Sequence, residues 1–257
     1  MKRYKKSYRT RKKISVFVIF KKKLFWLGLF FFIILSGLTY FFIFSSVFQI
    51  KNIAVLGTEK TPAQEIRIMI SDNVKNIFLA DLKKIDIMLL ERYPQIANVS
   101  IKRDIPDALL VQIEERKPVA VFSKNEEYFF IDKEAIIFEK ILEIPSKMLI
   151  IKSQEGPVGK ERLSQILKIN SILRNDLKIP IQGIRIVSEK KVDVETSEGW
   201  NIYFNLKKDL NWQLEKLGIL MKEKISLENR ENLEYIDLRF ENIYIYPENR
   251  RRVKRSN

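Results

Sequence analysis

Two of the residue types that most often carry enzyme chemistry are missing from this chain. Its 257 residues include no cysteine and no histidine. This excludes disulfides, thiolate nucleophiles, Ser-His-Asp triads and histidine-based zinc sites. A serine–lysine pair or two carboxylates remain as routes to catalysis, and the spacing of the 32 acidic residues singles out no pair.

Two short motifs come closest to a catalytic or phosphate-binding pattern. Ser188-Glu189-Lys190-Lys191 has Ser-x-x-Lys spacing, but it lies between two strand-like runs, where we expect a turn rather than the helix this motif needs. Gly156–Lys160 is too short for a phosphate-binding loop and is followed by Glu161 instead of serine or threonine. The sequence therefore argues against an enzyme and nominates no cofactor-binding or metal-binding residue.

A long apolar segment lies near the start of the chain. Leu24 to Ile50 contains no charged residue, and a helix over Leu24–Phe44 would be roughly 30 Å long, the thickness of a bilayer's hydrocarbon core. A buried core helix would need a polar face, which is missing. A signal peptide would have a shorter apolar segment and a small-residue cleavage site, where this chain has Phe41–Phe44. We therefore predict a transmembrane helix over residues 24–44.

The charges beside this segment predict its orientation. Residues 1–23 carry eleven Lys or Arg and no acidic residue. By the positive-inside rule, this basic tail stays in the cytoplasm and the rest of the chain is exported. Lys21, Lys22 and Lys23 stand directly before the helix and are the candidate contacts with the membrane surface. The prediction is a single-pass protein of the cell membrane.

The net charge of +15 belongs to the two ends of the chain. Residues 1–23 and, within the C-terminal tail 248–257, residues 250–257 hold sixteen of the 47 basic residues, which leaves 31 basic residues against 32 acidic ones over residues 24–249. The exported part is thus nearly neutral, and the charge gives no reason to expect nucleic acid as a partner. The alternative is that the tail binds nucleic acid, with Tyr4 and Tyr8 available for stacking.

The first exported segment predicts a β-α-α-β-β order. Phe48–Leu56 is a strand ending at Gly57, and Thr61-Pro62 starts a helix with Thr61 as its N-cap. Asp81 caps a second helix, which Tyr93-Pro94 stops. Two strands follow, around a turn at Ile105-Pro106-Asp107. The predicted core residues are Ile85, Leu89, Val111 and Ile113.

The remaining sequence predicts a second, β-rich domain with flanking helices. Strand-like and amphipathic runs alternate through it. The predicted helices are Lys160–Asn175 and a second one buried through Leu210, Leu214, Leu217 and Met221; the predicted strands are Ile184–Val187, Val192–Thr196, Trp200–Phe204 and Tyr235–Phe240. In the last strand Ile236, Leu238 and Phe240 share one face.

Several stretches resemble one known family. Lys102–Ala120, with its Arg103-x-x-Pro106 turn and its Glu115-Arg116-Lys117-Pro118-Val119-Ala120 exit, resembles the end of the POTRA domain in the bacterial cell-division proteins FtsQ and DivIB. Asn76–Asp81, Tyr128–Asp132 and Tyr235–Phe240 are similar to further signatures of that family. The resemblance implies an α+β fold: a transmembrane helix, a POTRA domain over 48–116 and an FtsQ-type β-domain over 117–247.

The resemblance also implies a function. It predicts a non-enzymatic divisome scaffold at the septum that links early and late cell-division proteins and regulates septal peptidoglycan synthesis. The implied partners are the bitopic proteins FtsB (DivIC in some bacteria) and FtsL. Two alternatives stay open: a POTRA-containing envelope assembly or secretion component, and a membrane-anchored cell-wall hydrolase, for which the sequence nominates no acid–base pair.

The last signature carries the predicted partner site. We expect the strand Tyr235–Phe240 (Tyr235, Ile236, Asp237, Leu238, Arg239, Phe240) to lie at a sheet edge and to bind an FtsB-like chain by β-augmentation. Tyr235 would pack an apolar partner residue and Arg239 would pair an acidic one, whereas Asp237 has the alternative role of fixing the local fold. The other reading is an internal strand, already paired on both sides, that only supports the domain.

One position departs from the family pattern. The family usually has a glycine three residues after the aspartate of its Ile-Asp turn, and this chain has Ala135 there. If that position requires a positive φ, the alanine is strained.

Overall fold

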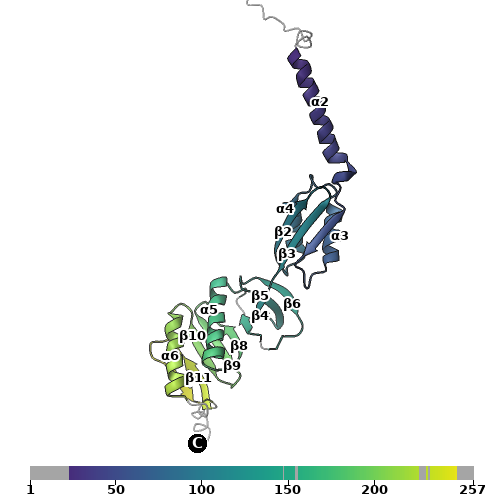
Figure 1. The fold of residues 1–257 in the computed structure, drawn as a ribbon. Helices are drawn as coiled ribbons and strands as arrows, with labels where there is room; N and C mark the ends of the chain where they lie inside the picture. The colour runs from purple at the N-terminus through teal and green to yellow at the C-terminus, as the bar shows by residue number, and fades with distance from the viewer. Residues whose placement is uncertain (1–22, 147, 154–155, 226–229, 231, 248–257) are drawn as a thin grey trace, which may run out of the picture. The chain divides into compact units, whose positions relative to one another are not determined.

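The structure is a computed structural model that describes residues 23–146, 148–153, 156–225, 230 and 232–247. The chain divides into two compact units, one of residues 1–91 with 98–114 and the other of residues 92–97 with 115–257 (Figure 1). Both mix helices and strands, so the α+β prediction is confirmed.

The first unit begins with a long apolar helix, α2 (Lys23–Phe44). Its 22 residues have a mean hydropathy of 2.3 over the most apolar window, and none of that window is buried. The helix is long and apolar enough to cross a membrane, which suggests a single-pass anchor and agrees with the predicted span to within one residue. Lys23 is its exposed first residue; Lys21, Lys22, the rest of the N-terminal basic tail and the C-terminal tail lie outside the described residues.

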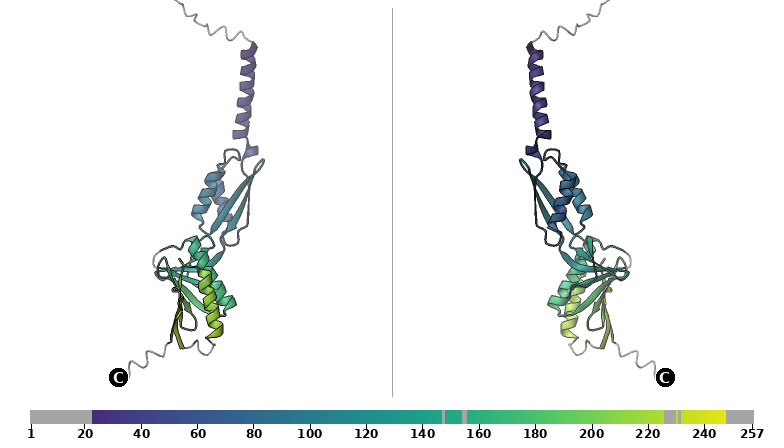
Figure 2. Two further views of the ribbon diagram at one scale, coloured as in Figure 1. Left: turned by 90° about the vertical axis from the view of Figure 1, so that its left-hand side faces the viewer. Right: turned by 90° about the vertical axis from the view of Figure 1, so that its right-hand side faces the viewer.

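The rest of the first unit has the predicted β-α-α-β-β order. A short 3₁₀ helix, η1 (Ser46–Phe48), leads into three strands and two helices: β1 (Asn52–Leu56), α3 (Ala63–Asn73), α4 (Leu82–Arg92), β2 (Ile96–Asp104) and β3 (Ala108–Glu115). The strand order is β1-β3-β2, with β1 parallel to β3. Both helices lie on the same face of this sheet (Figure 2).

The predicted core of this unit is confirmed. Ile85, Leu89, Val111 and Ile113 are each at most 3% exposed. Strand alternation and helical spacing place them on facing surfaces of the sheet and of α4.

The helix starts follow the predicted signals with one shift. Asp81 Oδ1 accepts a hydrogen bond from the Lys84 backbone N at 3.2 Å, so Asp81 caps α4 as expected. By contrast, α3 begins at Ala63 with Pro62 at the cap position, so the prediction that Thr61 is the N-cap is wrong by one residue. The fixed φ of proline suits the first residues of a helix, and the chain turns helical directly after it.

A buried amide joins α2 to this domain. Asn76, 6% exposed, donates from Nδ2 to the carbonyls of Phe42 (3.0 Å) and Ile43 (2.9 Å). Its Oδ1 accepts from the backbone N–H groups of Phe78 (2.8 Å) and Leu79 (3.3 Å). The last carbonyls of a helix have no partner within the helix, so Asn76 supplies a cap from 33 residues away.

The second unit is built on one nine-stranded sheet. Its strands are ordered β12-β11-β10-β9-β8-β7-β4-β5-β6. The elements are β4 (Pro118–Lys124), β5 (Glu127–Asp132), β6 (Ile137–Ile141), β7 (Ile150–Ser153), α5 (Lys160–Ser171), the π-helical turn η2 (Ile172–Asp176), β8 (Ile181–Ile186), β9 (Lys191–Thr196), β10 (Asn201–Asn205), α6 (Leu210–Glu223), β11 (Leu233–Asp237) and β12 (Tyr244–Pro247). Helices α5 and α6 lie against the same face of the sheet (Figures 1 and 2).

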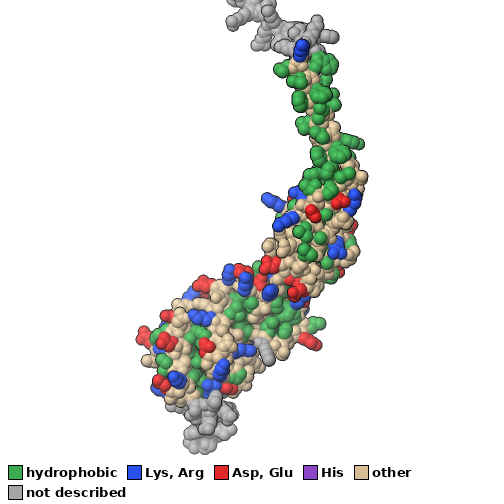
Figure 3. Space-filling model, viewed as in Figure 1, with side chains coloured by type: hydrophobic (Ala, Val, Ile, Leu, Met, Phe, Trp, Pro, Cys, Tyr) green, Lys and Arg blue, Asp and Glu red, His purple; other side chains and the backbone are tan. Residues whose placement is uncertain are grey.

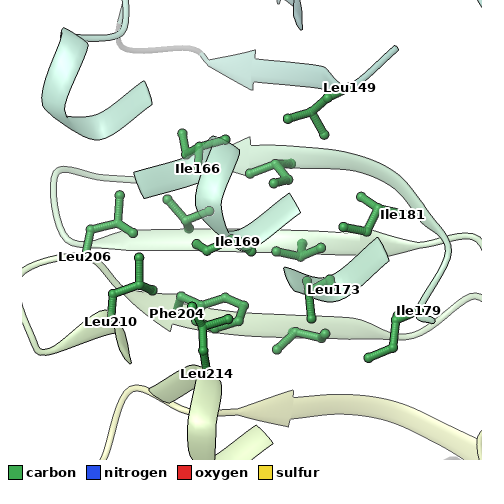
Figure 4. Packing of buried hydrophobic residues seen from close by; sticks show 14 of the residues in the cluster. Leu149, Ile166, Ile169, Leu173, Ile179, Ile181, Phe204, Leu206, Leu210 and Leu214 are labelled. Atoms are coloured by element: carbon green, nitrogen blue, oxygen red, sulfur yellow. The ribbon is translucent and has the colours of Figure 1, made fainter. Parts of the chain in front are cut away.

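The main core lies between these helices and the sheet. Ile166, Ile169 and Leu173 project from α5 and η2 towards the strands, next to Phe204 and Leu214 (Figure 4). The predicted inward residues of α6, namely Leu210, Leu214, Leu217 and Met221, are all buried. The predicted helix Lys160–Asn175 is not α-helical throughout: α5 ends at Ser171, and the next residues form the wider π turn η2.

The turn after β5 gives Ala135, where the family usually has glycine, a positive φ. Asp132 Oδ1 accepts from the backbone N of Glu134 (3.0 Å) and of Ile136 (2.8 Å), which bends the chain so that Ala135 has φ of +64°. A side chain with a Cβ is disfavoured there by about 1–2 kcal/mol. Ala135 thus occupies the strained conformation that a glycine would adopt without cost.

Two residues of the family signatures meet at this turn. Arg116 Nη1 lies 2.6 Å from Asp132 Oδ2, and the two side chains are only 14% and 7% exposed. The signatures Glu-Arg-x-Pro-Val-Ala and Ile-Asp therefore contribute to one buried ion pair, which has a structural role.

Candidate partner-binding site

The predicted partner strand is internal to the sheet, not at its edge. β11 pairs in parallel with β10 (Tyr203 opposite Asp237) and antiparallel with β12 (Asp237 opposite Tyr244). Its backbone groups are therefore used on both sides, and the expectation of an edge strand at Tyr235–Phe240 is wrong. The physical reason is that the chain returns after Asp237 and adds Tyr244–Pro247 outside it.

Three tyrosines form a ladder across these strands. The Tyr235 ring stacks on Tyr203 at a centroid distance of 5.2 Å and on Tyr246 at 5.4 Å. They come from β11, β10 and β12, and Tyr235 lies directly across from Tyr246 in register. Ile202 and Ile236, next to them in sequence, are buried in the core with the helices, so alternation places the tyrosines on the opposite face of the sheet. Tyr235 therefore packs within its own domain and holds the last strand in place.

Arg239 is bound by its own neighbour. Its Nε and Nη2 donate to Asp237 Oδ1 (2.8 Å) and Oδ2 (2.5 Å), and its backbone N donates to Oδ1 (3.0 Å). The hydrogen bond with Asp237 raises the pKa of Arg239 further above its ordinary value. Asp237 is 5% exposed, so it fixes the chain after β11, which was the alternative role for it.

The other residues of the predicted strand separate by face. Ile236 and Leu238 are buried in the core, as alternation predicts. Phe240 is 50% exposed, so the prediction that it shares their buried face is wrong. β11 ends at Asp237 and the chain bends at residues 239–240, so the alternation that still holds at Leu238 is lost by Phe240.

Among the residues that the structure describes, β12 is one of the two edge strands of this sheet. It stands last in the strand order, and Tyr244 and Ile245 are 54% and 40% exposed. Sequence reasoning missed this strand. The signal was present in Tyr-Ile-Tyr-Pro, in which aromatic residues alternate with an aliphatic one and a proline ends the run.

Charged residues lie next to the tyrosine ladder on the same face of the sheet. Lys152 Nζ lies 2.8 Å from Glu195 Oε2, and Arg185 also binds Glu195. Burial alone would raise the pKa of Glu195, but its bonds to these two cations lower it below the ordinary value. Two residues away, burial dominates and raises the pKa of Asp193, despite its pairing with Lys191 at 3.1 Å.

The motifs considered for catalysis have structural roles. Ser188 Oγ accepts hydrogen bonds from the backbone N of Lys190 (3.4 Å) and Lys191 (3.2 Å), which is the expected turn. The Lys191 ammonium lies beside Asp193 and over the Tyr203 ring. Gly159 precedes α5 as its cap residue. Within the described ranges no group of three His, Cys, Asp or Glu residues is arranged to hold a metal.

Comparison with known proteins gives two adjacent family matches. Residues 48–116 match the POTRA domain of FtsQ type, and residues 120–239 match the C-terminal domain of the cell division protein FtsQ/DivIB. The second match ends at Arg239, so it includes β11 and stops before β12.

Curated relatives carry the same names. The cell division protein FtsQ of Streptomyces bingchenggensis is 26% identical over 128 residues, which cover 49% of this chain and 48% of that protein. DivIB of Clostridium acetobutylicum is 29% identical over 156 residues, 53% of this chain and 59% of that protein. FtsQ of Neisseria gonorrhoeae is 26% identical over 155 residues, 58% of each.

The chain thus spans about half to three-fifths of the length of the curated relatives it matches. The two family matches follow each other in the order in which the fold places a POTRA-like domain and a β-rich domain behind an apolar helix. On this evidence the chain belongs to the FtsQ/DivIB family of cell-division proteins.

Proposed function

We propose that this protein is a non-enzymatic scaffold of the cell-division machinery, anchored by α2 and recruiting its partner through the open edge of β12. Its N-terminus lies in the cytoplasm and its POTRA domain (48–116) and β-domain (117–247) outside, at the septum, where it links early and late division proteins. The partners are an FtsB-like or DivIC-like chain and an FtsL-like chain, and the complex regulates septal peptidoglycan synthesis. The non-enzymatic part is supported by the places of the two candidate motifs, since Ser188 closes a turn and Gly159 precedes α5 as its cap residue.

The observation that carries the proposal is the edge position of β12. An edge strand presents backbone N–H and C=O groups that can pair with a strand from another chain. On its inner side β12 is held by β11: Tyr246 stacks on Tyr235, and Asp237, which binds Arg239, lies opposite Tyr244. Tyr235 and Arg239 therefore act on the partner through the strand that they support.

Proline substitution tests this edge directly. Neighbouring residues of a strand point their N–H groups to opposite sides, so of Tyr244→Pro and Ile245→Pro one removes a donor towards β11 and the other an outward donor. The outward variant should lose co-purification of the FtsB-like chain from membranes while its thermal unfolding stays unchanged. The inward variant should lower the melting temperature.

The opposite edge provides a matched control. β6 ends the sheet at its other side, and Glu139→Pro and Lys140→Pro repeat the same alternation there. The β6 variant that keeps its melting temperature should keep the partner. Retention of the partner by both folded β12 variants, or its loss from the folded β6 variant, would place the interface elsewhere.

The topology has a separate test. A reporter that is active only outside the cytoplasm, fused after Asn257, should give signal in cells. An inactive reporter, together with cleavage of the basic tail by external protease, would reverse the proposed orientation.

A further inference from the structure

The first unit has an apolar surface directly beyond the membrane helix. Phe44 ends α2, Val47 lies in η1, and Phe78 and Leu79 lie in the loop between α3 and α4. These four side chains are 65%, 45%, 41% and 63% exposed. The hydrophobic surface of α2 continues onto this end of the domain (Figure 3).

This loop is held rigidly. Asn76 binds the backbone N–H groups of Phe78 and Leu79 on one side and the end of α2 on the other. Arg103 reaches from β2 and donates from Nε to the Ile77 carbonyl (2.8 Å) and from Nη2 to the Ala80 carbonyl (2.7 Å). The Phe78 ring also contacts the Phe42 and Phe48 rings at 5.3 and 5.1 Å. The loop backbone is therefore fixed by hydrogen bonds, with the Leu79 side chain exposed and the Phe78 ring packed on one side and exposed on the other.

A pocket of about 470 Å³ opens beside this loop. Its apolar wall includes Ile43 and Phe44 from the membrane helix itself, together with Leu79 from the loop. Two exposed lysines, Lys75 and Lys84, and one carboxylate, Asp81, also line it. The pocket thus combines an apolar wall with two ammonium groups against one carboxylate, which suits a ligand that has an apolar chain and an anionic head group.

We propose that this pocket binds an anionic phospholipid of the leaflet at the C-terminal end of α2. The argument is one of position: Phe44 is both the last residue of the apolar span and part of the pocket wall, so the pocket lies at the depth of the lipid head groups. The lipid chain packs against Ile43, Phe44 and Leu79. Its phosphate lies between Lys75 and Lys84, whose aliphatic stems follow the apolar wall while their charged ends reach the head group.

The proposal rests on the membrane-anchor part of the proposed function and is independent of partner recruitment at β12. The β-domain can therefore fail its test while the lipid site passes, and the reverse also holds.

The absence of cysteine gives a clean depth measurement. Leu79→Cys in the full-length chain, spin-labelled and reconstituted into phosphatidylcholine–phosphatidylglycerol vesicles, should be relaxed more by oxygen than by a water-soluble nickel complex. Leu56→Cys is the matched control: Leu56 is 55% exposed, but it ends β1, roughly 13 Å along the strand from the end that follows α2. Its label should show the opposite preference.

The charge part is tested with Lys75→Gln/Lys84→Gln. Each basic residue near an anionic surface contributes about fivefold in binding, so the double variant should bind phosphatidylglycerol about 25-fold more weakly than the parent chain, measured by native mass spectrometry of lipid adducts. Phosphatidylcholine adducts should not change.

Three outcomes would overturn the proposal. The first is a Leu79 label that is relaxed more by the nickel complex than by oxygen, and the second is an unchanged preference for phosphatidylglycerol in the lysine variant. The third is a label shielded from both reagents only when another membrane protein is co-reconstituted, because this would make the surface a site for a partner helix instead of a lipid.

Discussion

Two ion pairs of equal length in the second unit should differ widely in energy. Arg116–Asp132 and Lys140–Glu127 both have N–O distances of 2.6 Å. The first pair is 14% and 7% exposed, whereas the second is 54% and 53% exposed. Removing one partner of a buried pair leaves an uncompensated charge and costs about 3–5 kcal/mol, while an exposed pair contributes about 0–1 kcal/mol. We predict that Asp132→Ala is several-fold more destabilising than Glu127→Ala.

The turn bonds of Asp132 add to this cost. Its Oδ1 also accepts two backbone hydrogen bonds, each with a net value of about 0.5–1.5 kcal/mol. Asp132→Asn keeps a side-chain oxygen for these two bonds but replaces the oxygen that accepts from Arg116 by an NH2 group, so it should lose the ion pair and still cost less than Asp132→Ala. Against a typical domain stability of about 5–15 kcal/mol, the alanine variant should lose a third or more.

Urea unfolding of a fragment that starts at Ser45 measures these costs, because guanidinium chloride would screen the ion pairs. The expected order is Asp132→Ala, then Asp132→Asn, then Glu127→Ala, with unchanged m values. Equal costs for Asp132→Ala and Glu127→Ala would refute the claim that burial, and not distance, sets the energy of these pairs.

Further predictions concern strain, packing and pH. Ala135→Gly should leave the free energy of unfolding unchanged or raise it by up to about 1 kcal/mol, because relief of the positive φ exceeds or balances the entropy cost of glycine; a clear loss in urea melts would contradict this. Leu89→Ala and Ile113→Ala should each cost about 2–5 kcal/mol, and an unchanged melting temperature would disprove the assigned core. Glu195→Gln should destabilise at neutral pH, since a lowered folded-state pKa stabilises above the ordinary value and this stabilisation is lost as pH falls through the folded pKa. Asp193→Asn should do the reverse, because the raised pKa of Asp193 means that its charge destabilises the fold at neutral pH. The variant should therefore be as stable as the parent or more stable at neutral pH, and it should show no gain in stability below the ordinary pKa of aspartate. The same pH dependence in both variants would refute these opposite directions.

Local patterns in the sequence were enough to predict the inward faces. Alternation on β3 and helical spacing on α4 and α6 each depend on neighbours a few residues away, so Val111, Leu89 and Leu214 could be assigned to the core before the fold was known. Asp81 could be recognised as a cap for the same reason.

The partner strand could not be placed in this way. Whether β11 is an edge depends on a four-residue strand that returns beside it, and no pattern inside Tyr235–Phe240 records that return. The partner of Arg239 was missed because two residues on one face of a strand were expected to point outward together, whereas Asp237 turns the chain and binds the guanidinium itself. The Arg116–Asp132 pair joins two separate signatures, and only the fold brings them together.

The amide of Asn76 has a mechanical consequence. It is bonded to two carbonyls of α2 and two N–H groups of the adjoining loop, so the helix and the domain behind it resist independent twisting. A rotation of α2 about its own axis would therefore rotate the adjoining domain with it. If other membrane helices contact α2, those contacts would set the rotational orientation of the folded domain about the axis of α2. They would thereby also set the direction from which a partner can approach.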